Sequence, residues 1–322
     1  MIKTVVLYHR GCNDGIVAAW AAWKVFGDVA EYIPYQYGEE LPVEVWGSNL
    51  IMVDLSLKAE QLSQVRSEVA SILIIDHHKS ALPLLNHMEP VKTYREYVRK
   101  RSDMSAAMIM FNQSYSGAVL AWAFFNDITD IESADMPYAL KLIQDYDLWE
   151  HKYPQTRPVN AWLLNLRPSI KRVDTLMTAS QHELDAIILS GENMLVYDAN
   201  IVRGVATGHG YLQVIQHEDK KIALINGPHH LRNALADWVI DEFDAVVVYT
   251  ERAQRTVYSL RSPKRMDVAA FAERFGGGGH KDSAAFSIKH SKLHTLLLRA
   301  PFYKLTLKER LVAGLRLIFK GA

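Results

Sequence analysis

The sequence predicts a two-domain α/β protein, in which a doubly wound, mostly parallel sheet is followed by a smaller α/β unit. Three short apolar runs, residues 4–8, 50–53 and 72–75, predict buried strands of the first sheet, and helical segments alternate with them. Strand-like runs return at residues 221–225, 245–249 and 256–260, which predicts the second unit. The length of 322 residues also favours two domains over one.

The composition restricts the class of function. The net charge is zero, which argues against a protein that coats long duplex nucleic acid. The single cysteine, Cys12, cannot form an internal disulfide and predicts a reducing compartment. The apolar run at the N-terminus is too short for a signal peptide, and no stretch approaches the roughly 20 apolar residues of a membrane span. We therefore expect a cytoplasmic protein that is not bound to membranes.

A polar loop follows the first predicted strand, and helical periodicity begins directly after it. The loop, residues 9–15, reads His-Arg-Gly-Cys-Asn-Asp-Gly, and the helix ends at Gly27. Backbone N–H groups at the N-terminus of a helix favour phosphate. His9 and Asp14 are therefore expected beside an anion site.

Acids and histidines also stand at the ends of the next two predicted strands. Asp54 follows the second strand, and Asp76-His77-His78 follows the third. Taken alone, the second group would fit a helix-capping aspartate before two surface histidines. The recurrence at three strand ends favours a metal site, because the carboxyl ends of parallel strands meet at one edge of a sheet. Two divalent cations about 3.5–4 Å apart could there polarise a phosphate and activate water.

These residues resemble the four motifs of the DHH phosphoesterase superfamily, which here read His9 with Asp14-Gly15, Asp54, Asp76-His77-His78, and an aspartate within residues 143–149. The resemblance implies a pair of manganese ions, with Mg²⁺, Zn²⁺ or Fe²⁺ as alternatives, held by His9, Asp14, Asp54, His77 and Asp145. Asp54 would bridge the two ions. By the same resemblance, His78 would be catalytic and face the scissile phosphate, while Asp76 would orient the neighbouring histidine.

Two positions depart from the motif pattern or leave it open. Cys12 stands where many members carry a metal-binding aspartate. It could ligate as a thiolate, which would favour softer ions such as zinc, or it could be a small buried residue with a water in place of the acid. In the fourth motif, Asp145 is preferred because it follows the largely apolar segment Leu-Lys-Leu-Ile at residues 140–143 and precedes an aromatic residue by four positions. Asp147 is the alternative ligand.

The informative end of the second unit is a run of four glycines, residues 276–279. Out of context this run would read as a flexible linker. It directly follows a predicted helix, however, and glycines let backbone amides approach a phosphate that an arginine can clamp. Residues 259–286 resemble the DHHA1 domain. That resemblance implies a substrate held across a cleft from the metals by Arg261, Gly278, Gly279 and His280.

We therefore expect a DHH catalytic domain at residues 1–180, a helical connector at 181–208 and a DHHA1 substrate-binding domain at 209–322. The basic tail of that domain, residues 291–322, is expected to be an amphipathic helix, with a homodimer or nucleic-acid contact left open. Residues 106–125 are expected to form one long helical region. His229 and His230 are read as loop histidines without a catalytic role.

Among the activities of the superfamily, the loop form and compact size most resemble the short-oligonucleotide hydrolases of nanoRNase or oligoribonuclease type. The resemblance implies exonucleolytic hydrolysis, of 3′–5′ or 5′–3′ polarity, of short single-stranded oligonucleotides or small nucleotides. Dephosphorylation of 3′-phosphoadenosine 5′-phosphate is a further implied activity. A cyclic- or linear-dinucleotide phosphodiesterase and a weakly catalytic nucleotide-binding regulator remain alternatives.

Overall fold

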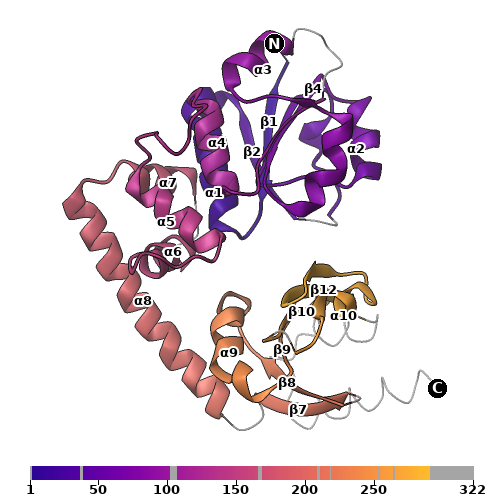
Figure 1. The fold of residues 1–322 in the computed structure, drawn as a ribbon, viewed down its shortest axis with the longest axis vertical. Coiled ribbons are helices and arrows are strands. Elements are labelled where there is room, and N and C mark those ends of the chain that lie inside the picture. The colour runs from indigo at the N-terminus through magenta and orange to yellow at the C-terminus, as the bar shows by residue number, and fades with distance from the viewer. Residues whose placement is uncertain are drawn as a thin grey trace, which may run out of the picture. The chain divides into compact units, whose positions relative to one another are not determined.

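The computed structural model describes residues 2–36, 39–101, 107–165, 169–208, 211–217, 219–252, 254–263 and 265–290. The chain forms two compact units, Met1–Leu195 and Val196–Ala322. The division falls within α8 (Gln181–Thr207), a helix of 27 residues (Figure 1). Leu184 and Ile187 near the start of α8 pack into the core of the first unit, and Val202 near its end packs into the core of the second.

The first unit is built on a six-stranded sheet in the order β2-β1-β3-β4-β6-β5, and every strand pair in it is parallel. The strands are β1 (Thr4–His9), β2 (Glu31–Tyr35), β3 (Asn49–Val53), β4 (Ser71–Asp76), β5 (Glu89–Pro90) and β6 (Ala107–Phe111). This sheet confirms the predicted parallel α/β architecture.

Helices cover both faces of this sheet, as a doubly wound fold requires. The helices of this unit are α1 (Asn13–Phe26), α2 (Ala59–Arg66), α3 (Tyr94–Lys100), α4 (Gly117–Phe125), α5 (Tyr138–Asp147), α6 (Thr156–Asn165) and α7 (Ile170–Met177), with 3₁₀ segments at Gly27–Val29, Val43–Val45 and Lys79–His87. Helices α5, α6 and α7 pack against α1, and α5 also packs against α4. Successive strand residues point to opposite faces, so Val6 joins a core with α1 and α4 while Val5 joins another core with α2. Figure 1 shows α1 and α4 on one side of the sheet and α2 on the other.

The expectation of one long helical region at residues 106–125 is wrong. Residues Ala107–Phe111 form strand β6, and the helix α4 begins only at Gly117. Ser116 caps α4, because its side-chain oxygen accepts a hydrogen bond from the N–H of Val119. A short apolar run reads equally well as a buried strand or a buried helix, and here the pairing of β6 with β4 decides between them.

The second unit is built on a six-stranded sheet in the order β11-β12-β10-β9-β8-β7, in which only the β8–β9 pair is parallel among the described strands. Its elements are β7 (Leu212–His217), β8 (Lys220–Asn226), α9 (Arg232–Val239), β9 (Ala245–Glu251), β10 (Arg255–Arg261), α10 (Val268–Glu273), β11 (Gly278–His280) and β12 (Ser283–Lys289), with 3₁₀ segments at His229–Leu231 and Ile240–Glu242. Leu235 of α9 packs in the core on one face, and Val268 of α10 packs in the core on the other. This second α/β unit is confirmed, whereas the amphipathic helix expected at 291–322 lies outside the described residues.

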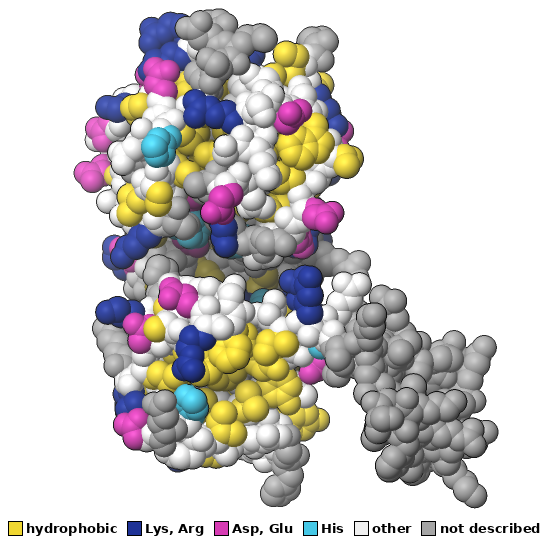
Figure 2. All heavy atoms as spheres, turned by 90° about the vertical axis from the view of Figure 1, so that its right-hand side faces the viewer, with side chains coloured by type: hydrophobic (Ala, Val, Ile, Leu, Met, Phe, Trp, Pro, Cys, Tyr) yellow, Lys and Arg dark blue, Asp and Glu magenta, His cyan; other side chains and the backbone are white. Residues whose placement is uncertain are grey.

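The surface carries charges of both signs. Figure 2 shows one face, on which Lys or Arg and Asp or Glu side chains alternate and hydrophobic side chains gather over part of the second unit. This face carries no extended field of a single sign, in keeping with a net charge of zero. Among the helices that the structure describes, none has both the length and the apolar composition needed to cross a membrane.

Candidate metal centre

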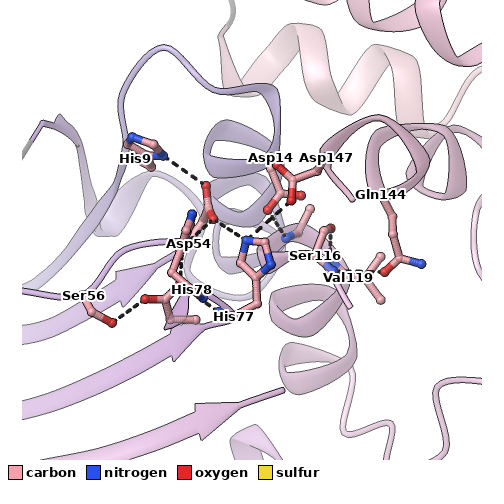
Figure 3. Close-up of polar contacts among 12 residues, drawn as sticks. His9, Asp14, Asp54, Ser56, His77, His78, Ser116, Val119, Gln144 and Asp147 are labelled. Atoms are coloured by element: carbon pink, nitrogen blue, oxygen red, sulfur yellow. Dashed lines mark hydrogen bonds and ion pairs between the residues drawn. The ribbon is translucent and has the colours of Figure 1, made fainter. Parts of the chain in front are cut away.

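Three adjacent parallel strands deliver the predicted ligands to one edge of the first sheet. Strand β1 ends at His9, β3 ends one residue before Asp54, and β4 ends at Asp76, directly before His77 and His78. The strands lie in the order β1-β3-β4, so their carboxyl ends are neighbours. Figure 3 shows the side chains of His9, Asp54 and His77 directed toward one another at this edge.

Asp54 occupies the centre of the cluster. Its Oδ2 lies 3.6 Å from Nδ1 of His9, and its Oδ1 lies 3.2 Å from Nε2 of His77 (Figure 3). The two carboxylate oxygens therefore face different histidines. Asp54 has φ = 53°, a left-handed conformation that is costly for a residue with a side chain. Its N–H still bonds to the carbonyl of Ile75 at 2.9 Å, which holds this strained turn against strand β4.

Potential ligand atoms fall into three overlapping groups, and within each group the atoms lie within 4.8 Å of one another. The groups are His9, Cys12 and Asp54; Asp14, His77 and Asp147; and Asp54, Asp76, His77 and His78. Asp54 and His77 each belong to two groups, so the cluster is continuous. Such a set could hold two cations that share a ligand.

Two glycines allow helices to approach the cluster closely. A Cβ at Gly15 would lie 2.4 Å from the carbonyl oxygen of His9, and a Cβ at Gly117 would lie 2.7 Å from Cβ of Asp54. Gly15 thus lets α1 begin directly against the end of β1, and Gly117 lets α4 begin against Asp54. The N–H of Ala118 donates to Oδ2 of Asp14 at 3.1 Å, which fixes this carboxylate at the N-terminus of α4.

The buried carboxylates of the cluster raise the pKa of Asp14 and of Asp147. Burial, together with the charges of Asp147 and Asp54, raises the pKa of Asp14 well above its usual range. Burial and the charge of Asp54 raise the pKa of Asp147 to about 6. Raised pKa values mean that these buried acids ionise less readily. A bound cation would favour their ionised form, because it would neutralise their negative charges.

The same carboxylates favour the charged, protonated form of His77. Burial lowers the pKa of His77, but the hydrogen bond to Asp54 and the charges of Asp14, Asp54 and Asp147 outweigh it and raise the pKa to about 9. Burial raises the pKa of Asp54, but its hydrogen bond with His77 and the proximity of His9 outweigh this effect and lower it. Protonated His77 therefore supplies positive charge to Asp14, Asp54 and Asp147, as a bound cation would.

The donor set fits divalent cations. Oδ1 of Asp14 is buried and has no hydrogen-bond partner among the described residues. Such a carboxylate oxygen is costly to bury unless it is paired or coordinates a metal. Carboxylates and imidazoles together suit manganese, iron or zinc.

The fourth motif supplies Asp147 to the cluster in place of the preferred Asp145. Oδ2 of Asp147 lies 3.5 Å from Nε2 of His77. Asp145 instead accepts hydrogen bonds from the N–H of Lys152 at 2.9 Å and from the hydroxyl of Thr156, and it belongs to no ligand group among the described residues. Its role in the structure is to hold the chain that follows α5. The geometry therefore favours Asp147 as the ligand.

Asp76 holds His78 in one orientation. Its Oδ1 lies 2.7 Å from Nδ1 of His78 and also accepts the backbone N–H of His77 at 2.8 Å. Its Oδ2 accepts a hydrogen bond from the hydroxyl of Ser56. Asp76 is fully buried, whereas a third of the His78 side chain is exposed. This arrangement leaves Nε2 of His78 as the ring nitrogen that can meet a substrate.

The predicted substrate residues of the second unit lie at one end of its sheet. Arg261, the last residue of β10, is paired with Ser283 of β12, and Ser283 is in turn paired with His280 of β11. Gly279 has φ = 146°, and a Cβ there would lie 2.4 Å from the carbonyl oxygen of Ser283. The glycine run is therefore part of a turn and an edge strand, and the linker interpretation is wrong. The side chain of His280 lies outside what the structure describes.

Arg261 has basic neighbours that sequence reasoning missed. Its Nη2 donates to Oδ1 of Asn233 at 2.7 Å. Burial and the charge of Arg232 lower the pKa of Arg261 to about 10. Burial, Arg232 and Arg252 lower the pKa of His229 to about 4, and Arg261 adds to this effect. His229, expected from the sequence to be a loop histidine without a catalytic role, therefore lies among arginines. Its position in the connection that follows strand β8, three residues after Asn226, is the signal that could have revealed it.

Comparisons with known proteins agree with this fold. No protein-family model matches the chain. A protein of Acanthamoeba polyphaga mimivirus described as uncharacterized protein R106 is 26% identical over 311 residues, which cover 89% of this chain and 68% of that protein. The DHH domain of a protein described as a member of a family of ribosomal proteins has a TM-score of 0.55 at 11% identity, over 95% of this chain and 87% of that one.

Two further solved structures are similar at lower scores. They are a pGpG-specific phosphodiesterase, PggH, of Vibrio cholerae (15% identity, TM-score 0.47, 89% of this chain and 93% of that chain) and RecJ of Thermus thermophilus in complex with Mn²⁺ (13% identity, TM-score 0.49, 92% and 51%). The score of 0.55 shows that this chain has the fold of a DHH-domain protein.

Proposed function

We propose that this protein is a metal-dependent phosphoesterase of the DHH superfamily that hydrolyses phosphodiester bonds in short oligonucleotides or small nucleotides. The observation that carries the proposal is the position of Asp54, whose two carboxylate oxygens face His9 and His77 from the middle of a continuous set of acids and imidazoles. A carboxylate shared between two ligand groups is what a site for two cations needs.

Two divalent cations, with Mn²⁺ as the first candidate, would polarise a phosphate and supply a nucleophile from water at this site. His9 and Asp54 would hold one of them. Asp14, His77 and Asp147 would hold the other together with Asp54, while the close start of α4 at Gly117 keeps the acids in place. The roles of His9, Asp14, Asp54 and His77 follow the motif pattern, and Asp147 replaces Asp145 on the basis of its contact with His77.

His78 would act on the substrate directly. Its Nδ1 is engaged by Asp76, so Nε2 would donate a hydrogen bond or a proton to a phosphate oxygen as negative charge grows there. Asp76 would favour the tautomer or charged form of His78 that carries a proton on Nδ1. His78 is thus assigned a catalytic role, and Asp76 a positioning role.

We assign the second unit to substrate binding. Arg261, Gly278, Gly279 and His280 follow the DHHA1 pattern, and the cationic neighbours of Arg261 favour a phosphate or another anion there. In this proposal residues 1–180 provide the chemistry, 181–208 connect the parts, and 209–322 bind the substrate. A net charge of zero suits a substrate with few phosphates.

The test is hydrolysis of a substrate panel by the full chain with and without Mn²⁺. The panel contains RNA of two to five nucleotides, pApA, a cyclic dinucleotide, 3′-phosphoadenosine 5′-phosphate and a long single strand. We expect Mn²⁺-dependent turnover of the short RNAs, and faster cleavage of a dinucleotide than of any longer RNA would favour a dinucleotide phosphodiesterase. Because even residues outside the direct ligand set typically cost about 10–100-fold, Asp54→Asn should reduce turnover by more than about 100-fold.

Glu60→Gln is the matched control, since it removes an exposed acid of α2. It should leave turnover unchanged. Absence of metal-dependent turnover on every member of the panel would contradict the proposed function and favour a nucleotide-binding regulator.

A further inference from the structure

We propose that His9, Cys12 and Asp54 form a thiolate-containing metal site, so that the two ion positions of the centre prefer different metals. The position at Cys12 would take a softer ion such as Zn²⁺ or Co²⁺. The position at Asp14, His77 and Asp147 would take a harder ion such as Mn²⁺ or Mg²⁺. This inference rests on the proposed metal centre and specifies its composition.

Cys12 is placed to ligate by the loop between β1 and α1. One ligand atom from each of His9, Cys12 and Asp54 lies within 4.8 Å of the others. The chain turns at residues 10–11, where Gly11 has the left-handed φ of 75°, and a ligand atom of Cys12 lies within 4.8 Å of one of His9, three positions earlier. The N–H of Arg10 bonds to the carbonyl of Tyr35 at 2.9 Å and anchors the start of the turn on the sheet.

Helix capping does not explain why residue 12 is a cysteine. Cys12 is the N-cap residue of α1, where Ser, Thr, Asp or Asn would satisfy a free backbone N–H. Its side chain makes no capping hydrogen bond. Among the described residues, Cys12 also belongs to neither hydrophobic core of the first unit, and it is only partly buried. Its sulfur lies within 4.8 Å of a ligand atom of His9 and of Asp54.

The Cys12 thiolate can replace an aspartate carboxylate at this position, because the charge is the same and the distance from the backbone to the metal is similar. Both carry one negative charge, so the neutralisation of a divalent cation is preserved. The sulfur lies one bond closer to the backbone than an aspartate oxygen, and a metal–sulfur bond of about 2.3 Å, against about 2.0–2.2 Å for oxygen, partly offsets the difference. What changes is softness, because sulfur favours zinc-like ions whereas carboxylates suit manganese and magnesium.

The experiment is optical titration of the full, reduced chain with Co²⁺. Since Cys12 is the only cysteine, a thiolate-to-cobalt charge-transfer band can come only from this residue. We expect the band to saturate at one equivalent of Co²⁺ per chain, to be displaced by Zn²⁺ and to resist Mn²⁺. Cys12→Ser should abolish the band. In equilibrium dialysis, Cys12→Asp should lower Zn²⁺ affinity relative to Mn²⁺ affinity by at least about tenfold.

The outcomes separate this inference from the proposed function. Co²⁺ bound by the wild-type chain without a charge-transfer band would overturn the role of Cys12 and leave the phosphoesterase proposal standing. An unchanged ratio of Zn²⁺ to Mn²⁺ affinity in Cys12→Asp would also overturn it. If the wild-type chain binds no Co²⁺, Zn²⁺ or Mn²⁺, the metal centre fails, and both proposals fail with it.

Discussion

Gly117 lies so close to Asp54 that a Cβ at position 117 would fall 2.7 Å from Cβ of Asp54 and 2.9 Å from its Oδ1. The same Cβ would lie 2.8 Å from Oδ2 of Asp14. The start of α4 therefore packs directly on two of the proposed ligands. A small displacement of this helix would alter the geometry of both.

We expect Gly117→Ala to lower the affinity for Mn²⁺ and to reduce turnover by about 100-fold, because a displacement of about 1 Å can cost this much. Electron paramagnetic resonance of free Mn²⁺ gives the affinity, and kcat on a short RNA gives the turnover. Gly204→Ala is the control, since a Cβ at this helical position meets no atom within 4 Å. It should be neutral or stabilise the protein by about 0.5–1 kcal/mol. Normal metal binding by Gly117→Ala would contradict the close-packing argument.

Substitution of Asp147 should affect metal binding, whereas substitution of Asp145 should affect folding stability. Asp147→Asn should weaken Mn²⁺ binding with little change in thermal stability, because the side chain contacts His77 in the ligand cluster. Asp145→Asn should keep metal binding and lower stability by about 1–3 kcal/mol, because an amide N–H would face the donors of Lys152 and Thr156. Calorimetric metal titration and chemical denaturation measure the two effects. The reverse pattern would return the ligand role to Asp145.

Asp76→Asn should reduce kcat by about 10–100-fold while metal affinity changes little. The reason is that Asp76 contacts Nδ1 of His78 at 2.7 Å and sets its orientation without belonging to the proposed ligands. Nitrogen-15 NMR of the His78 ring should show a changed tautomer population in the variant. Ser56→Ala, which removes only the hydroxyl that donates to Asp76, should have a smaller effect in the same direction. A loss of metal with unchanged His78 signals would argue against the positioning role.

Arg261→Gln should raise KM for a short RNA by about 10–100-fold, which corresponds to losing a charged hydrogen bond of about 1.5–3 kcal/mol. Mn²⁺ affinity should not change, because Arg261 lies in the second unit. Arg255→Gln is the matched control: it removes an exposed arginine from the first residue of the same strand, β10. Equal effects of the two changes would show that only overall charge matters.

His229 should stay neutral until the pH falls to about 4, because burial and the nearby arginines lower its pKa from 6.5. Between pH 6.5 and about 4 the unfolded chain binds more protons at this residue than the folded chain, so folding stability from His229 decreases as the pH falls through this window. The titration of its C2 proton by NMR, assigned with His229→Gln, gives the midpoint. Inorganic phosphate should raise this midpoint if the cluster binds anions. A midpoint near 6.5 in the free protein would contradict the burial of His229 among cationic groups.

The sequence by itself determined the architecture of the first unit and the identity of most candidate ligands. A short β-branched run followed by an acid or a histidine fixes where a buried strand ends, and the carboxyl ends of neighbouring parallel strands coincide. The sequence alone therefore predicts that His9, Asp54 and His77 lie together. The predicted helix that precedes the glycine run at 276–279 likewise argues that this run is not a flexible linker.

The tertiary structure decided which way side chains on a helix point and which residues far apart in the sequence come into contact. Asp145 and Asp147 lie about 200° apart around one helix, and only the packing of α5 determines which of them faces His77. The apolar residues 107–111 became a strand because β4 offered them a pairing edge. His229 and Arg232 joined Arg261 only because the connection after β8 brings them to the end of β10. Local pattern fixes where an element ends and which side chains stand there, whereas the direction of a side chain and its charged neighbours follow from contacts between residues far apart in the chain.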